Sequence, residues 1–494
     1  MNLIRRRTMT SLFTAVTVAT ALAAPAGAAT IDISGSVRPT PAGPAVPPMF
    51  MGYSIEWGLV GRMLGNQDAR FTAMADSIRH LELFTGPMLL RIGGNSEDEA
   101  AYHLHRLRNR PKFVHIDIRR RTLIQMRKLA QTTGCRYVIG LNLGINRPGP
   151  AVRLVKAAER YIGRRHIAAF EIGNEADFLG RFGRWWKHNH YAMYLRRWTR
   201  YYHAIAPYLH GIKIEGPAFG GEGWFKHLAG YLRREHTRLG IVSLHRYPLG
   251  ATITNPHSPQ YADIHNLLKA DTAGQFAAEM KWVVHLAAPY HLPVRFGEMN
   301  SAWGGGKKGV SNTFASTLWT ATTLMDIAQA GGAGVNMHMS QGVDQFPGWY
   351  GPLRFGPGGR LHRMPEYDGM LAAAEVIQHG ARPVPMRLHT HMNVGGFAYE
   401  TSGHRLRVAV INRTSSTRLM VHLNLPTDMK LLREYRIGAP DIRAVRGVTI
   451  VGYRISGPAR SRLTGHRMIK HRSGSDGRVI SSPAASIVIN VYQG

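Results

Sequence analysis

Ala168-Ala169-Phe170-Glu171-Ile172-Gly173-Asn174-Glu175 is the stretch of the sequence that decides the fold. The apolar run Ala168–Gly173 has the length of a buried strand, and it ends in a turn that carries Asn174 and Glu175. Seven similar runs flank it, so that eight strands are expected: Phe50–Glu56, Met88–Gly93, Tyr137–Leu143, Ala168–Gly173, Ile212–Gly216, Ile241–His245, Val294–Glu298 and Val335–His338.

Segments with the 3.6-residue periodicity of amphipathic helices separate these runs. They include Ala69–Leu83, Thr122–Gln131, Tyr191–Ile205, Thr272–His285 and Thr313–Ala330. Strand–helix alternation indicates a parallel sheet, and eight repeats in about 325 residues favour a closed barrel. We therefore predict an α/β protein with a (β/α)8 TIM barrel over residues 49–378. An open doubly wound sheet is the alternative, although Gly93-Gly94-Asn95 does not form a G-x-G-x-x-G turn.

The pattern of the sequence changes after residue 378. Short alternating strands separated by turn residues are expected at Gly396–Glu400, Leu406–Ile411, Leu419–Leu423 and Ser486–Val491. This pattern predicts a C-terminal β-sandwich over residues 379–494. Residues 29–48 hold one more strand, Ile31–Val37, and a proline-rich connector, and we expect this strand to pack on the sandwich.

The first 28 residues have the pattern of an export signal. Arg5–Arg7 form a basic start, Leu12–Ala24 is a short apolar run, and Ala26-Gly27-Ala28 offers a cleavage site. A twin-arginine signal is the alternative, but its hydrophobic positions match poorly. No later run reaches the ~20 apolar residues of a membrane span. We expect a protein exported to a periplasm or to the medium.

The chain carries an excess of positive charge, since 62 lysines and arginines face 30 carboxylates, which gives +32. Such a field attracts polyanions, for which nucleic acid, an anionic envelope and acidic polysaccharide are candidates, or it is only a solvated basic surface. Arg119–Arg121 and Arg405–Arg413 lack the interleaved aromatics of a nucleic-acid platform, so no specific nucleic-acid partner is expected. The single cysteine, Cys135, reads as a buried apolar residue, and no ligand spacing predicts a metal.

Polar residues that follow the strands carry the chemistry, because barrel enzymes react at the C-terminal ends of their strands. Glu175 ends the fourth strand and Glu298 the seventh, while His245 and Tyr247 end the sixth. A single such glutamate is usually a structural ion pair, but a pair on opposite strands suits glycoside cleavage. Carboxyls about 5 Å apart predict retention of configuration. We place His245 and Tyr247 in the substrate site, where they would orient the nucleophile.

Three stretches carry a resemblance to a known family. Gly297-Glu298-Met299-Asn300-Ser301-Ala302-Trp303-Gly304-Gly305-Gly306 resembles the nucleophile loop of the heparanase and β-glucuronidase family, glycoside hydrolase family 79. Leu90–Ser96 is similar to the second-strand motif of this family, and Gly173–Phe178 to its acid/base motif. The family belongs to the retaining (β/α)8 glycosidases, and the resemblance extends over the barrel and, loosely, the sandwich.

The resemblance implies roles for five residues of the barrel. Glu175 would be the acid/base and Glu298 the nucleophile. Asn174 would bond the sugar 2-hydroxyl, Glu56 would bind sugar hydroxyls, and Asn95 would lie near Glu56 in the substrate site. A structural ion pair with an arginine is the alternative for Glu56.

The resemblance also implies a site for a uronate carboxylate. The N–H groups of Gly304 and Gly305 and the hydroxyl of Tyr350 would bind it; a flexible turn and a packed aromatic residue are the alternatives. Trp303 stands where the family usually has tyrosine, so an indole would face the substrate there. Arg246 stands where animal heparanases carry a second histidine, which separates this chain from their sulfated-chain specificity.

The sequence thus predicts an exported retaining β-glucuronidase that releases terminal glucuronic acid from an acidic oligo- or polysaccharide. The mechanism needs two carboxylates, and neither a metal nor an organic cofactor is expected. The alternatives are an endo-acting heparanase-like enzyme, a neutral-sugar glycosidase and a non-catalytic polyanion-binding protein.

Overall fold

The computed structural model describes residues 29–65, 68–179, 190–343, 346–454, 463, 469–470 and 477–494. The expected export signal, 1–28, lies outside the described residues. None of the helices within the described ranges combines the length and hydropathy that crossing a bilayer requires.

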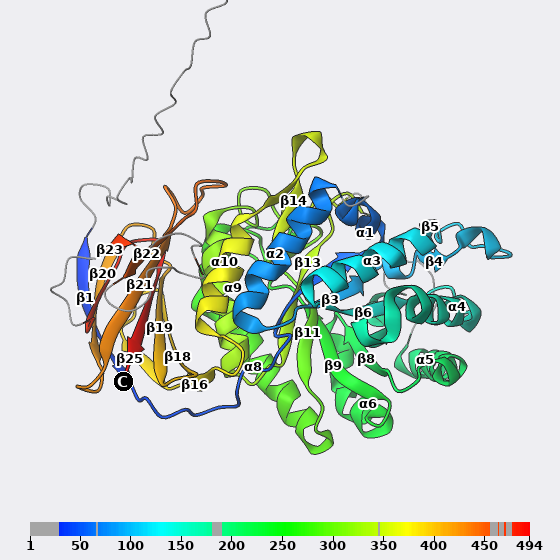
Figure 1. Cartoon of the computed structure of the whole chain (residues 1–494), viewed down its shortest axis with the longest axis horizontal. Coiled ribbons are helices and arrows are strands. Elements are labelled where there is room, and N and C mark those ends of the chain that lie inside the picture. Colours follow the sequence, from blue (N-terminus) through cyan, green and yellow to red (C-terminus); the bar gives the residue numbers. More distant parts are fainter. Residues whose placement is uncertain are drawn as a thin grey trace, which may run out of the picture.

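A closed parallel barrel of eight strands forms the centre of the molecule (Figure 1), which confirms the predicted fold. Each predicted strand is present to within a few residues. In barrel order the strands are β2 (Met51–Glu56), β3 (Leu89–Gly93), β6 (Arg136–Leu141), β7 (Ile167–Ile172), β8 (Lys213–Phe219), β9 (Leu239–Arg246), β11 (Val294–Met299) and β13 (Gly334–Met339).

Helices cover the outside of the barrel (Figure 1). They are α1 (Trp57–Leu64), α2 (Ala69–Thr85), α3 (Arg120–Thr133), α4 (Pro148–Ala158), α5 (Tyr191–Ile205), α6 (Leu228–Glu235), α7 (Ile264–Leu268), α8 (Ala270–Ala287), α9 (Phe314–Gln329) and α10 (Pro365–Val376). Short strand pairs lie in the loops: β4 (Ala100–Tyr102) with β5 (Ile116–Ile118), β10 (Leu249–Gly250) with β12 (Ala302–Trp303), and β14 (Leu353–Phe355) with β15 (Leu361–Arg363).

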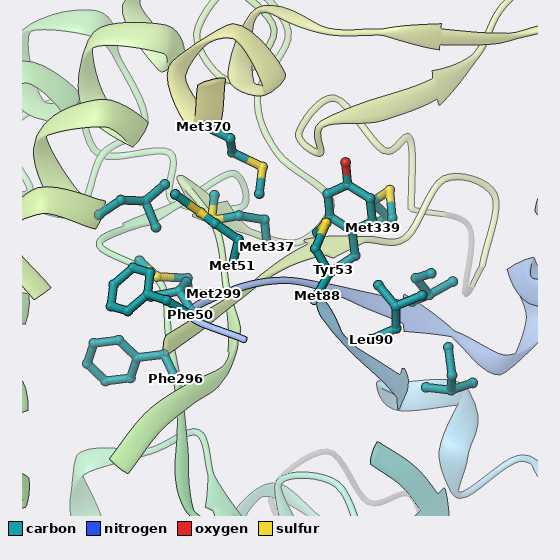
Figure 2. Packing of buried hydrophobic residues seen from close by; sticks show 14 of the residues in the cluster. Phe50, Met51, Tyr53, Met88, Leu90, Phe296, Met299, Met337, Met339 and Met370 are labelled. Carbon is teal, nitrogen blue, oxygen red and sulfur yellow. The ribbon is translucent and has the colours of Figure 1, made fainter. Parts of the chain in front are cut away.

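Apolar side chains on the outer face of the barrel pack against the helices. Figure 2 shows part of this layer, in which Met51, Met299 and Met337 come from three strands and Met370 from α10. These methionines are at most 1% exposed. Because methionine is flexible at three bonds, it fills irregular gaps between sheet and helix.

The interior of the barrel is polar, unlike the branched aliphatic filling of many TIM barrels. Arg91 binds Glu171 and Ser54, while Arg295 donates to Asn336 Oδ1 over 2.8 Å. Glycines make room for these side chains: a Cβ at Gly297 would lie 2.7 Å from Glu215 Oε1. Alternation along β3 and β7 therefore sends Leu90, Ile92, Phe170 and Ile172 into the outer apolar layer and Arg91 and Glu171 inward.

Two β-sheets beside the barrel form the sandwich (Figure 1). One has the order β17-β1-β20-β24 and the other β16-β18-β19-β25-β21-β22-β23. Their strands are β1 (Thr30–Val37), β16 (Arg382–Val384), β17 (Met386–His389), β18 (Val394–Thr401), β19 (Arg405–Asn412), β20 (Arg418–Asn424), β21 (Lys430–Gly438), β22 (Thr449–Arg454), β23 (Ile469–Lys470), β24 (Val479–Ser482) and β25 (Ser486–Gln493). Strand β1 lies between β17 and β20, so it belongs to the same part of the molecule as the C-terminal strand β25.

Candidate active site

The two predicted catalytic glutamates meet at the C-terminal ends of β7 and β11. Glu175 follows β7 with φ of +43°, and its N–H donates to Ala218 O on β8 over 3.1 Å. Glu298 belongs to β11 and is 6% exposed. One carboxylate oxygen of each glutamate and a ring nitrogen of His245 all lie within 4.8 Å of one another. This separation fits the pair of carboxyls of a retaining glycosidase.

Glu298 is held by hydrogen bonds to both of its oxygens. Arg91 Nη1 donates to Oε2 over 2.6 Å, and the Tyr247 hydroxyl donates to Oε1 over 2.7 Å. His338 Nδ1 lies 3.5 Å from Oε2. Every one of these contacts favours the ionised form of Glu298.

The surroundings of the two glutamates move their pKa values in opposite directions. Burial, with the negative charge of Glu298, raises the pKa of Glu175 to about 8. Burial would also raise the pKa of Glu298, but His338, His245, Arg91 and the Tyr247 hydroxyl outweigh it and lower that pKa to about 2. Near pH 7 one carboxyl is therefore protonated and the other ionised, as an acid and a nucleophile must be.

His245 and Tyr247 each contact a different glutamate. Tyr247 contacts Glu298, as expected for a residue that orients the nucleophile. His245 instead hydrogen-bonds the other glutamate, since its Nδ1 lies 3.2 Å from Glu175 Oε1, and its expected role in orienting the nucleophile stays a prediction. Burial, followed by the charge of Arg91, lowers the pKa of His245 to about 4, so its ring is neutral near pH 7.

Arg91 is a central residue of the site that the sequence reading did not select. Its guanidinium is fully buried and contacts Glu298, Glu171 and Asn174, whose Oδ1 accepts from Nη2 over 2.8 Å. Asn174 Nδ2 in turn lies 3.4 Å from Asn95 Oδ1. Arg91 thus fixes the nucleophile and the predicted 2-hydroxyl ligand relative to each other.

His338, at the end of β13, is the second residue that was missed. Its Nε2 lies 3.4 Å from Glu56 Oε1, and its Nδ1 lies 3.0 Å from Ser54 Oγ. Burial opposes protonation of this ring, but Glu298 and Glu56 outweigh burial and raise the pKa of His338. A charged residue inside the otherwise apolar strand β3 is the signal that could have identified Arg91; β13 also holds the polar Asn336, so His338 has no such signal.

Glu56 ends β2 and holds the loop that follows β3. Its Oε2 accepts from Ser96 N over 2.8 Å, and its Oε1 accepts from Asn95 N over 3.2 Å. Within the described part of the chain no arginine pairs with Glu56, but its side chain is only 1% exposed. Its role as a ligand of sugar hydroxyls stays a prediction.

The residues expected at the uronate carboxylate lie together, and Tyr350 lies beside Tyr247, the hydrogen-bond partner of Glu298. Gly304, Gly305 and Gly306 have φ of +81°, +86° and +80°, a turn that a side chain would strain. The turn packs on the segment before Tyr350, since Trp349 N donates to Gly305 O over 2.7 Å. Tyr350 is 4% exposed, and its ring centroid lies 5.9 Å from that of Tyr247.

Trp303 flanks the same turn. Its indole covers Gly250, where a Cβ would lie 2.2 Å from Trp303 Cζ2. Trp303 O accepts from Ala251 N over 3.0 Å, which fixes β12 against β10. Trp303 is half-buried, and its expected contact with the substrate stays a prediction.

A buried carboxylate of α10 holds the nucleophile loop and the Tyr350 segment together. Glu366 Oε1 accepts from Asn300 Nδ2 over 2.9 Å, and its Oε2 accepts from Gly351 N over 2.7 Å. Asn300 Nδ2 also donates to His338 O over 3.1 Å. The parts of the site therefore share one framework, which favours a fixed geometry.

Glu175, His245 and Glu298 could also hold a divalent cation, since they offer two oxygens and one nitrogen within 4.8 Å. An ion there would occupy both carboxylates. A glycosidase reaction needs these two groups free, so the same grouping serves acid/base chemistry without a metal.

The sequence is similar to known β-glucuronidases. It is 25% identical over 335 residues to a β-glucuronidase of Neurospora crassa, covering 59% of this chain and 57% of that protein. It is 23% identical over 436 residues to a β-glucuronidase of Aspergillus niger, covering 77% of this chain and 74% of that protein. The match thus spans little more than half of the Neurospora protein. No protein-family model matches the sequence.

The fold is similar to those of solved glycosidase structures. A 4-O-α-L-rhamnosyl-β-D-glucuronidase of Fusarium oxysporum superposes with a TM-score of 0.69 at 18% identity, covering 92% of this chain and 99% of that one. An α-L-arabinofuranosidase of Thermotoga maritima has a TM-score of 0.65 at 14% identity, covering 93% and 99%. With the fungal sequences, these similarities confirm the predicted resemblance to the heparanase and β-glucuronidase family.

Proposed function

We propose that this protein is a retaining β-glucuronidase that releases β-linked glucuronic acid from glucuronide-containing saccharides. The observation that carries the proposal is the pair Glu175 and Glu298, within 4.8 Å of each other, with pKa values of about 8 and about 2. The similarity to two fungal β-glucuronidases supports the choice of sugar.

The reaction takes two steps. In the first, a Glu298 oxygen attacks the anomeric carbon while Glu175 gives its proton to the departing glycosidic oxygen, which leaves a glycosyl ester on Glu298. In the second, Glu175 takes a proton from water, and the resulting hydroxide equivalent attacks the same carbon and frees Glu298. Two displacements on one carbon retain the β configuration.

The uronate carboxylate would lie between the glycine turn Gly304–Gly306 and Tyr350. Backbone N–H groups in a tight turn and a phenol hydroxyl donate to an anion without adding a cation next to Glu298. The contact between the glycine turn and the Tyr350 segment and the position of Tyr350 beside Tyr247 support this assignment.

Hydrolysis of an aryl β-D-glucuronide and of the matching β-D-glucoside tests the proposal. We expect the wild type to hydrolyse the glucuronide with retention, and Glu298→Gln to lose at least ~10⁴-fold of the rate, because the nucleophile is gone. Glu222→Gln, which removes an exposed carboxylate that pairs with Arg246, serves as the matched control and should keep full activity.

Other outcomes identify the alternatives. Turnover of the glucoside alone would make the protein a neutral-sugar glycosidase and the Gly304 and Tyr350 assignment wrong. Failure to hydrolyse either aryl glycoside, together with cleavage of a long glucuronate chain, would identify an endo-acting heparanase-like enzyme. Failure on both kinds of substrate would leave the non-catalytic polyanion-binding protein.

We also propose that the protein is exported through its N-terminal segment. The lone thiol suits an oxidising compartment, because Cys135 is buried and burial raises its pKa to about 12. Expression with and without residues 1–28, followed by fractionation, tests the proposal; equal distribution of the two forms would contradict it.

A further inference from the structure

One flank of the barrel carries a large share of the positive charge. Between His103 and His166 the chain has sixteen lysines and arginines but two carboxylates, Asp117 and Glu159. This segment forms α3, α4 and the turns around them, on the side of the barrel away from the sandwich (Figure 1). The catalytic centre uses none of these cations.

A pocket of about 370 Å³ opens within this flank. It is lined by Lys156, Glu159, Arg160, Arg164, Tyr208 and His210. Lys156, Arg160, Arg164 and His210 are exposed, so their charged ends are available to a ligand.

Contacts among the lining residues hold their side chains in place. Glu159 Oε2 lies 2.8 Å from His210 Nδ1, and Glu159 Oε1 lies 3.4 Å from Arg164 Nε. Lys156 Nζ lies 3.9 Å from the centroid of the Tyr208 ring. One carboxylate thus orients the pocket, but it neutralises only one of the three permanent cations.

The pocket lies at the opposite end of the barrel from the catalytic glutamates. The turn Arg164–His166 leads directly into β7, and the turn Ala206–Tyr208 precedes β8, so the pocket is placed where these strands begin. Glu175 lies where β7 ends. A six-residue strand separates the two sites by roughly 20 Å.

The field around the pocket is not balanced by nearby acids. Burial, followed by the charges of Arg165, Arg127 and Arg136, lowers the pKa of His166. Arg127 Nη2 donates to Arg160 O over 2.8 Å, which brings a further cation to the pocket edge. An anion entering here would lower the repulsion among these groups.

We propose that this pocket and the cations at its edge form a second binding site, which holds a uronate-bearing polysaccharide by its carboxylates. A chain held there would keep the protein close to polymeric substrate without occupying the catalytic centre. The choice of a uronate polymer rests on the proposed function, whereas the site itself rests on the pocket and its charges.

The aromatic residues of the flank favour a polysaccharide over nucleic acid. Bases bind single-strand platforms by stacking on open aromatic faces. Here Arg120 and Arg160 lie over the Tyr161 ring at 5.1 and 5.4 Å, and Lys156 lies over that of Tyr208. Cations therefore already cover the Tyr161 and Tyr208 rings, so a ligand would bind here through its charge and not by stacking on these rings.

Binding of the full-length protein to polygalacturonate tests the proposal, because an α-linked polyuronate is not a substrate of a β-glucuronidase. Lys156→Gln/Arg160→Gln/Arg164→Gln should weaken binding about tenfold at low salt, since three ion contacts are lost. The control Arg387→Gln/Arg405→Gln/Lys430→Gln removes the same charge from exposed positions of the sandwich and should change binding less than twofold.

Glu159→Gln gives the opposite test. It removes the carboxylate of the pocket, so binding should tighten about two- to threefold. Equal Tm values establish that each variant is folded, and aryl glucuronide hydrolysis, if the wild type has it, should not change in any of them.

Three results would overturn the proposal. The first is an equal loss of binding in the two triple variants, and the second is unchanged or weaker binding by Glu159→Gln. The third is binding of neutral dextran or of duplex DNA as tight as that of polygalacturonate at the same ionic strength. Failure of the proposed function looks different. The protein would then not hydrolyse the aryl glucuronide, while the pocket variant would still lose polyuronate binding and the sandwich control would keep it.

Discussion

Glu175 and Glu298 end two strands on opposite sides of one barrel, yet their surroundings have opposite effects. Glu298 receives hydrogen bonds from Arg91 and Tyr247 and lies close to His338. The Glu175 side chain is 18% exposed and contacts His245, which is neutral near pH 7. The same residue type therefore has a pKa of about 2 in one place and about 8 in the other.

The difference shows that the roles are assigned by neighbours rather than by position at the strand ends. A carboxyl surrounded by donors and cations stays ionised and can attack, whereas a buried carboxyl that also faces another negative charge keeps its proton. Removing those neighbours one at a time should reduce the difference between the two pKa values, by an amount that depends on the neighbour removed.

Removal of Arg91 should have the largest effect. Arg91→Met leaves Glu298 and Glu171 buried without their cation, which should cost about 3–5 kcal/mol of unfolding free energy. It should also raise the pKa of Glu298. Urea unfolding and the acid limb of the kcat/KM profile measure the two effects.

Arg295→Met is the matched control for Arg91. Arg295 is also buried, but it bonds to Asn336 and to Met49 O instead of the nucleophile. We expect Arg295→Met to lose a comparable free energy of unfolding and to leave the acid limb of the kcat/KM profile unchanged. If both variants shift the acid limb equally, Arg91 has no specific effect on Glu298.

Tyr247→Phe should have the next largest effect. It removes a hydrogen bond to a charged group, worth about 1.5–3 kcal/mol, so kcat/KM should fall about 10- to 100-fold. Because the hydroxyl favours the ionised form of Glu298, its loss raises that pKa, and the acid limb moves to higher pH. Tyr137→Phe removes a buried hydroxyl that donates to Met126 O, far from the site, and should leave the limb in place.

The sequence was sufficient to predict where the two glutamates lie. An apolar run followed by a polar residue identifies a strand end, and alternation with helices identifies the barrel; Ala168–Glu175 and Val294–Glu298 have this pattern. The strand Ile31–Val37 was also expected from its alternation, and β1 pairs with β17 and β20.

The partners of these glutamates could not be predicted in the same way. Arg91 stands inside an apolar run and His338 near the end of β13, and only the neighbour relations of the closed barrel bring them to Glu298. The hydrogen bond of His245 to Glu175 could not be predicted, because strand position fixes where a residue lies but not the direction of its ring. The glycine turn was predicted from resemblance, and its backbone angles became visible only in the structure.

Tyr350→Phe separates sugar recognition from chemistry. Loss of one hydroxyl that would donate to the uronate should reduce the glucuronide-to-glucoside ratio of kcat/KM about tenfold, through KM more than kcat. Ser340→Ala removes the hydroxyl that donates to Tyr350 over 3.1 Å and should give a smaller reduction. An unchanged ratio in Tyr350→Phe would make this residue only a packed aromatic.

The smallest effect is expected on the pKa of Glu175 in Glu298→Gln. Removing the negative charge makes ionisation of Glu175 easier, so its pKa should fall from about 8. Burial is the larger cause of the shift and remains in the variant, so the pKa should stay above the ordinary value for glutamate. Titration of ¹³C-labelled glutamate carboxyls by NMR measures it, with Glu222→Gln as the variant that leaves the signal unmoved. A pKa that does not fall would mean that burial alone keeps the acid protonated, and the contrast between the two glutamates would then not depend on their mutual repulsion.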